Sequence, residues 1–313
     1  MIKNEILKIK IAKLFYQNGF SKIEIGEKLR ISRLKVASLL EDAVTDGIVK
    51  ITINEPENYY IDLENKIEKK FGIHRAVIIE TGVNYEETKR YIGRAAANCL
   101  ESLIYDNDII GVAWGSSIFE MVNALPEKIN RDNITLVQIT GGSEQVPMDV
   151  NASELTRRIA KIFDANSYYL HAPAIVTSRE ARDILISEIG IKKTFEMFNK
   201  VNFAIVGIGS TLPEPSTILY RNGIIKNSDI DSISRNCMGD INSYFYDKNG
   251  IECDITLQSK VIGMSLEQLK KVRSVMAIAG GEQKIDAIYS ALKGRLVNII
   301  ITDKKTAESI LSK

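Results

Sequence analysis

The sequence predicts an α/β protein made of a small helical N-terminal domain and a larger, doubly wound α/β domain. Three observations carry this prediction. Apolar positions recur at helical spacing in the first 54 residues, β-rich apolar runs alternate with amphipathic segments in the rest, and a short polar segment separates the two regions. At 313 residues, 45% apolar and 26% charged, the chain is long enough for two domains with their own cores.

Composition excludes several classes of protein. No apolar run approaches the roughly 20 residues of a membrane span, and the N-terminus lacks the features of a secretion signal, so we expect a cytoplasmic protein. The cysteines Cys99, Cys237 and Cys253 form an odd, widely spaced set. They predict buried, unpaired thiols rather than a zinc site, and we expect neither a metal nor a cofactor.

Residues 1–54 predict three helices. The first should end at Gly19, and residues 21–43 predict two short helices joined by a tight turn. Ser21 and Ser32 stand where hydroxyl groups would cap the two helix starts. Gly26 lies inside the second helix, which indicates a neighbouring helix too close for a side chain, although an isolated helical glycine can simply be tolerated.

The third helix is predicted to expose a polar, basic face. Apolar residues recur on one side of it, which leaves Ser32, Arg33, Lys35 and Ser38 on the other. Residues 1–53 hold ten basic and six acidic side chains, a net charge of +4, whereas the whole chain has +1. A basic outer face of this kind is suited to the major groove of DNA. The alternative is a small helical bundle that contacts protein.

After the third helix, an Asp-Gly turn leads into residues 48–54, whose alternating pattern predicts a strand or wing. Residues 55–60 combine a proline with two acids and predict a short linker. Residues 61–313 then form the second domain, beginning with a helix that could carry motion between domains or pair with a second subunit.

The second domain alternates buried strands and helices, as a doubly wound sheet does. The expected strands are 76–80, 109–114, 134–140, 203–209, 274–280 and 297–302. The expected helices include 86–103, 116–125, 152–164 and 285–292. In such sheets, ligands bind beyond the carboxyl ends of the strands.

Glycine-rich turns gather at those carboxyl ends and predict a polar small-molecule site. Taken singly, each could be an ordinary strand-to-helix turn. Glycine permits tight turns, and hydroxyl groups at a helix start can bind an anion. The turns contain Gly115, Ser116 and Ser117, then Thr140, Gly141 and Gly142, then Gly207 and Gly209, and finally Gly280 and Gly281. The dinucleotide and Walker phosphate-binding patterns are absent, so NAD and ATP are poor candidates.

Three further side chains are candidates for sugar recognition. Asp240 could accept hydrogen bonds from hydroxyl groups, and Lys284 could pair with phosphate or form a Schiff base. A capping Asp and a surface Lys are the structural alternatives. His171 could line the cleft or be a structural histidine.

The chain resembles the SorC/DeoR family of bacterial sugar-responsive transcriptional regulators along nearly its whole length. The matching stretches are IGEKLRISRLKVASLLEDAVTDGIVKI, DIIGVAWGSS, VQITGGS, YYLHAPAIV, VGIGS, MGDINSYFYDKNG and AIAGGEQKIDAIYSALKG. The resemblance implies a winged or sigma-like helix-turn-helix, an effector domain related in fold to sugar-phosphate isomerases and deaminases, and dimers or tetramers that bind palindromic operators.

The resemblance also implies roles for residues. The phosphate cradle would be Gly115, Ser116 and Ser117 with Gly141 and Gly142 beside it, Asp240 would hold sugar hydroxyls, and Lys284 would contact the phosphate. Two departures change this picture. Thr140 stands where some relatives have a phosphate-binding Arg or a Lys that bonds covalently to the sugar, so we expect non-covalent binding. The third predicted helix reads SRLKVASLL here, where many members of the family have SRPTVSRLL. Lys35, Ala37 and Ser38 therefore change the set of side chains that would face the DNA groove.

Three functions follow as hypotheses. The leading one is a regulator whose operator binding is modulated by a sugar, expected to be phosphorylated. The second is a sugar-phosphate isomerase or deaminase with a helical appendage, which would need an acid–base pair at the strand ends. The third is a sugar-binding adaptor whose N-terminal domain contacts protein; salt-dependent affinity for duplex DNA would distinguish it from the first.

Overall fold

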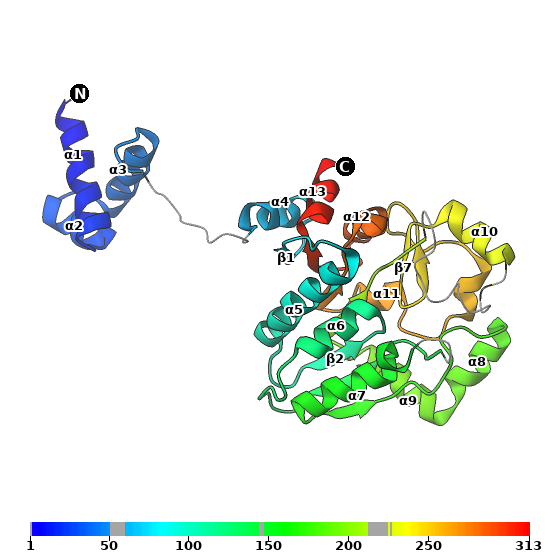
Figure 1. Cartoon of the computed structure of the whole chain (residues 1–313). Helices are drawn as coiled ribbons and strands as arrows, with labels where there is room; N and C mark the ends of the chain where they lie inside the picture. Colours follow the sequence, from blue (N-terminus) through cyan, green and yellow to red (C-terminus); the bar gives the residue numbers. More distant parts are fainter. Residues whose placement is uncertain (1, 51–59, 144–146, 212–224, 226) are drawn as a thin grey trace. The chain divides into compact units, whose positions relative to one another are not determined.

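The computed structural model describes residues 2–50, 60–143, 147–211, 225 and 227–313 (Figure 1). The chain divides into two compact units, Met1–Glu57 and Asn58–Lys313, which we call the head and the body. The described helices include none that is long and apolar enough to cross a membrane.

The described part of the head, residues 2–50, contains three α-helices around a small core. Helix α1 (Ile2–Ala12) continues into a short π-helical segment (Lys13–Gln17), and α2 (Lys22–Leu29) and α3 (Arg33–Thr45) follow. Ser21 caps α2 by accepting a hydrogen bond from the N–H of Glu24 (3.3 Å), and Ser32 caps α3 by accepting from the N–H of Lys35 (3.1 Å). The buried apolar core consists of Ile11, Ile25, Val36, Leu39 and Leu40.

Gly26 is required by the turn between α2 and α3. A Cβ atom at this position would lie 2.8 Å from the carbonyl oxygen of Ile31. The close neighbour is therefore the turn itself rather than a crossing helix. Arg30 has a left-handed backbone (φ 52°), which ends α2 and starts this turn.

The predicted wing falls largely outside the described residues. Residues 48–50 are described and form no strand, although the N–H of Val49 donates to the carbonyl of Ala43 (2.9 Å). Residues 51–54 of the wing and 55–59 of the linker lie outside the described ranges.

The body is built on a parallel sheet, which confirms the α/β prediction. Its seven strands lie in the order β1-β10-β9-β5-β2-β3-β4. They are β1 (Arg75–Ile79), β2 (Ile109–Val112), β3 (Thr135–Gln138), β4 (Asn166–Tyr168), β5 (Phe203–Gly207), β9 (Ser274–Ile278) and β10 (Ile299–Asp303). The apolar runs predict six of these; β4 escapes prediction because its sequence Asn-Ser-Tyr is polar and only partly buried.

Helices cover both faces of this sheet. From β2 the chain proceeds to β3 and β4, whereas from β5 it proceeds in the opposite direction to β9 and β10. Right-handed crossovers therefore place α5 (Tyr85–Leu103), α6 (Ser116–Ala124) and α7 (Ala152–Phe163) on one face and α12 (Ile285–Lys293) on the other. Helix α13 (Lys304–Ser312) packs between α12 and α4 (Ile61–Phe71) (Figure 1). The remaining helices are α8 (Arg179–Ser187), α9 (Ile189–Phe198), α10 (Asn227–Asn236) and α11 (Leu266–Leu269).

A second, antiparallel sheet lies beyond the end of β5. It consists of β6 (Gly209–Ser210), β7 (Gly239–Ile241) and β8 (Tyr244–Tyr246), and Asp240 pairs with Gly209 in its register. Because β6 follows β5 directly, this sheet brings Asp240 to the carboxyl edge of the main sheet.

The cysteine prediction is wrong for one pair. Cys99 is a free, buried thiol, but the structure joins Cys237 and Cys253 as a disulfide, with Cα atoms 6.2 Å apart. The hairpin of β7 and β8 brings residue 253 back beside residue 237, and the spacing in the sequence does not reveal this.

Helix α4 protects the exposed edge of the main sheet. The edge strand β1 directs two N–H groups away from the sheet: that of Ala76 donates to Glu68 Oε1 and that of Ile78 to Glu64 Oε1, both at 2.9 Å. Four residues of helix rise about 6 Å, close to the length of two strand residues, so the carboxylates match the spacing of the N–H groups. Burial raises the pKa of Glu64.

We expect Glu64→Ala and Glu68→Ala each to lower the free energy of unfolding by about 1–3 kcal/mol, because each leaves a strand N–H group without its acceptor. Urea unfolding of the full chain, followed by the fluorescence of Trp114, measures this; the chain has one tryptophan. Asp62→Ala is the matched control, since Asp62 is exposed on the same helix and should change stability by a few tenths of a kcal/mol. Equal stability of all three variants would contradict the role of these carboxylates.

Candidate functional site

The helix start after β2 offers free hydrogen-bonding groups at the carboxyl edge of the sheet. The chain changes direction between β2 and β5, the position at which doubly wound sheets bind ligands. Gly115 caps α6 with φ +138°, and a Cβ atom there would meet open space. The side chains of Ser116 and Ser117 make no hydrogen bond within the described part of the chain, and the first N–H groups of α6 lack intrahelical acceptors. An anion could bind here.

The double glycines have a different role from the predicted one. The N–H of Gly141 donates to Ile262 O (2.9 Å) and that of Gly142 to Ala172 O (2.8 Å), so neither is free for an anion. A Cβ atom on Gly141 would lie 2.5 Å from Pro173 O. These glycines permit neighbouring backbone segments to pack closely.

Gly280 and Gly281 also pack against protein. A Cβ atom on Gly280 would lie 2.5 Å from Asp303 Oδ2, and the N–H of Gly281 donates to this oxygen and to Thr306 Oγ1, both at 2.9 Å. Asp303 is buried and also accepts from the hydroxyl of Thr81 (2.9 Å), so its carboxylate is well satisfied. The Gly281 N–H group is therefore already used by protein acceptors.

Lys284 and Asp240, 44 positions apart in the chain, lie within each other's electrostatic influence. Lys284 Nζ donates to the carbonyl oxygen of Ile208, just after β5, at 2.7 Å. Burial lowers the pKa of Lys284 to about 8, against the opposing effect of Asp240. Burial raises the pKa of Asp240 to about 6, against the hydrogen bond from the N–H of Ser243 and the charge of Lys284. The site thus holds a buried carboxylate and an amine that both titrate near neutral pH.

Four buried oxygen atoms, of Asp240, of the β7–β8 turn that follows it and of Thr140, have no hydrogen-bond partner among the described residues: Asp240 Oδ1, Asn242 Oδ1, Ser243 Oγ and Thr140 Oγ1. Asn242 Nδ2 donates to Met264 O (3.4 Å), and the adjoining residue, Gly263, forms a bridge with Thr140. These contacts place Thr140 next to the turn between β7 and β8. Buried acceptors without donors are costly, so the arrangement favours a ligand that supplies hydroxyl groups.

Asn242 and Ser243 are candidate site residues that the sequence alone does not single out. Both have left-handed backbones, with φ values of 56° and 68°, as the two central residues of a tight hairpin turn do. The pair Asn-Ser between two short strands is the available signal. It indicates the turn but not the buried, unpartnered oxygens.

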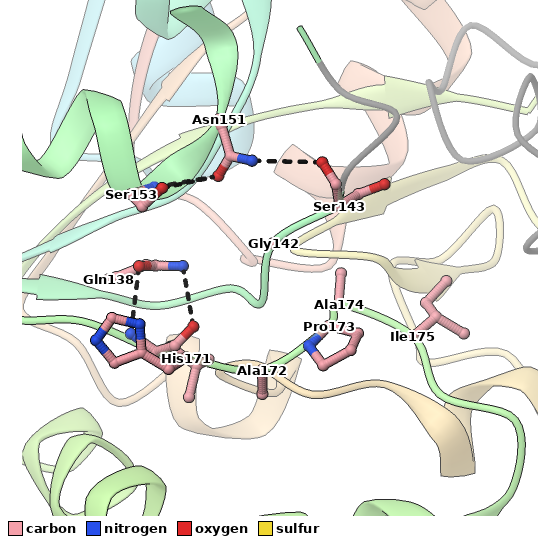
Figure 2. Close-up of a pocket in the computed structure, with 11 residues that line it drawn as sticks. Gln138, Gly142, Ser143, Asn151, Ser153, His171, Ala172, Pro173, Ala174 and Ile175 are labelled. Atoms are coloured by element: carbon pink, nitrogen blue, oxygen red, sulfur yellow. Dashed lines mark hydrogen bonds between the residues drawn. The ribbon is translucent and has the colours of Figure 1, made fainter. Parts of the chain in front are cut away.

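A cavity of about 710 Å³ adjoins Gly142 at the ends of β3 and β4. The Gln138 side chain is hydrogen-bonded to the backbone of Leu170. Figure 2 shows Asn151 linking Ser143 to the start of α7. His171, a candidate cleft residue from its sequence context, lines this cavity and is exposed. The amides of Gln138 and Asn151 already have protein partners, so they hold the loops in place.

In the head, all four predicted DNA-facing residues are exposed. Ser32 is the N-cap of α3, Ser38 lies opposite the buried side of that helix, and Arg33 and Lys35 lie on its flanks. The two cations have solvated side chains that a phosphate backbone could contact. Within the described ranges, no group of three or more His, Cys, Asp or Glu side chains could hold a metal ion.

Comparison with known proteins gives consistent matches over the whole chain. A family model described as "Putative sugar-binding domain" matches residues 56–312. The sorbitol operon regulator of Klebsiella pneumoniae is 31% identical over 305 residues, covering 97% of this chain and 96% of that protein. The deoxyribonucleoside regulator of Bacillus subtilis (strain 168) is 28% identical over 309 residues, covering 98% and 97%. The crystal structure of full-length SorC from K. pneumoniae superposes with a TM-score of 0.76 at 30% identity, covering 97% of this chain and 98% of that one.

Proposed function

Because the chain belongs to the family of sugar-binding SorC/DeoR-type transcriptional regulators, we propose that it binds operator DNA through its head and that a sugar bound to its body modulates this binding. The observation that carries the sugar proposal is the set of buried, unpartnered oxygens at Asp240, in the β7–β8 turn that follows it and at Thr140. Carboxylate and amide oxygens accept hydrogen bonds, and a sugar offers several hydroxyl donors in a small volume.

We extend this to a phosphorylated sugar, bound without a covalent bond. Lys284 supplies a positive charge next to Asp240, and the start of α6 at Gly115, Ser116 and Ser117 supplies free N–H and hydroxyl groups. Together they support recognition of an anion at one end of a polyhydroxylated ligand. The bound sugar would favour one arrangement of subunits in a dimer or tetramer and so set the spacing of the α3 helices.

A thermal-shift screen of phosphorylated and free sugars tests this proposal. A phosphosugar at about 100 times its Kd should stabilise the protein by about 2.7 kcal/mol and raise the Tm by about 5 °C or more. The corresponding free sugar should give a smaller shift. No shift with any phosphosugar would count against the anion site at the start of α6.

Effector affinity should depend on pH. Asp240 is ionised above about pH 6 and Lys284 is protonated below about pH 8, so affinity for a phosphosugar should be highest between these values. Above pH 8 it should fall by up to about tenfold per pH unit as Lys284 loses its charge. Calorimetric titration at a series of pH values measures both limbs. In Lys284→Met the decrease in affinity above pH 8 should disappear. If the decrease persists in that variant, another titrating group causes it.

The alternative of an enzyme is favoured by one observation, the pKa values of Asp240 and Lys284 on either side of neutrality, since catalytic acids and bases share this property. We propose that the pair serves binding, because the matched relatives are named as regulators. Turnover of a sugar phosphate by the purified chain would overturn this assignment.

A further inference from the structure

Leu34 is unusually exposed for a large apolar side chain. It has 82% of its surface accessible and lies in the first turn of α3, between Arg33 and Lys35. Solitary exposed leucines need no explanation by themselves. Leu34 does call for an explanation, because it lies near the N-terminus of α3, where the base-reading residues of a recognition helix lie.

The geometry of α3 places Leu34 at the centre of its outer face. At about 100° per residue, Leu34 and Ser38 point directly away from the buried stripe of Val36, Leu39, Leu40 and Ala43. Arg33 and Lys35 project about 100° to either side of Leu34. Ser38 is one turn further along the same line, so the two side chains are neighbours on the helix surface.

This arrangement separates two kinds of DNA contact. Cations on the flanks of a helix in the major groove meet the phosphates along the groove walls, whereas the central side chains meet the base edges. An aliphatic side chain cannot read hydrogen-bond donors or acceptors. The apolar group that the major groove presents is the C5 methyl of thymine.

We infer that Leu34 is a specificity-determining residue that contacts a thymine methyl group in each operator half-site. The inference rests on the proposed function of the head, and it adds a base preference to it. Arg33 and Lys35 position α3 on the phosphates, and Leu34 with Ser38 then faces the base pairs.

The test uses the full chain and duplexes selected from a random-sequence pool. Each thymine of the selected half-site is replaced by deoxyuridine, which lacks only the methyl group, and Kd is measured by fluorescence anisotropy. At one thymine per half-site, the replacement should weaken binding of the unaltered protein about three- to tenfold. Leu34→Ala should weaken binding by a similar factor and show no further weakening on that deoxyuridine duplex.

Val44→Ala is the matched control, because Val44 is an exposed apolar residue (40%) on the same helix, nearer its C-terminal end. It should retain the full deoxyuridine effect. The inference is overturned if no thymine is sensitive to loss of its methyl group, or if Leu34→Ala keeps the same sensitivity. Failure of the unaltered protein to select or bind any duplex would instead overturn the proposed function of the head.

Discussion

Replacing Lys284 by Met should reduce the affinity for a phosphorylated sugar by about 10- to 150-fold. The substitution removes the positive charge beside Asp240 while keeping the length of the side chain. A charge-assisted hydrogen bond contributes about 1.5–3 kcal/mol, and about 1.4 kcal/mol changes affinity tenfold.

Isothermal titration calorimetry with the phosphosugar found by thermal shift measures this effect. Lys293→Met is the matched control, since Lys293 is exposed at the end of α12, the helix that Lys284 precedes as its N-cap, and its ammonium group contacts Asn249. It should bind the ligand as the unaltered protein does. An affinity of Lys284→Met within threefold of the unaltered protein would contradict the assignment of Lys284 to the site.

Replacing both Arg33 and Lys35 by Ala should abolish operator binding at physiological salt while leaving sugar binding intact. Both side chains are exposed on α3 and have no ion-pair partner among the described residues, so their substitution should not disturb the head. Removal of one phosphate-binding cation should reduce the slope of log Kobs against log salt by about 0.9. Gel shift and anisotropy at several salt concentrations measure both quantities.

Lys193→Ala provides the control for the change in charge, because Lys193 is exposed on α9 in the body. Its effect on DNA binding should be small. Unchanged operator affinity in the Arg33/Lys35 double variant would show that α3 does not enter the groove.

The fold was largely predictable because its main signals are local. Buried parallel strands are continuous apolar runs, and the helix starts carry capping side chains such as Ser21 and Ser32. What escaped prediction lacks such signals. Strand β4 is polar, and the three-stranded sheet of β6, β7 and β8 is made of two- and three-residue strands that only tertiary pairing defines.

The candidate site was predictable in its residue types but not in its geometry. The sequence indicated Asp240 and Lys284, and in the structure each shifts the pKa of the other. It could not show that the N–H groups of Gly141, Gly142 and Gly281 already donate to protein acceptors, because glycine-rich turns look alike whether their N–H groups are free or used. The unpartnered oxygens could not be predicted either, because residues distant in the sequence bury them.

Sugar binding in the body and DNA binding in the head should be coupled. The most direct test measures four dissociation constants with the selected duplex and the identified phosphosugar: each ligand alone, and each with the other at saturation. The sugar should change DNA affinity by about 5- to 150-fold, and DNA should change sugar affinity by the same factor. If each ligand still binds but neither changes the affinity for the other, the coupling is contradicted, and the proposed function with it.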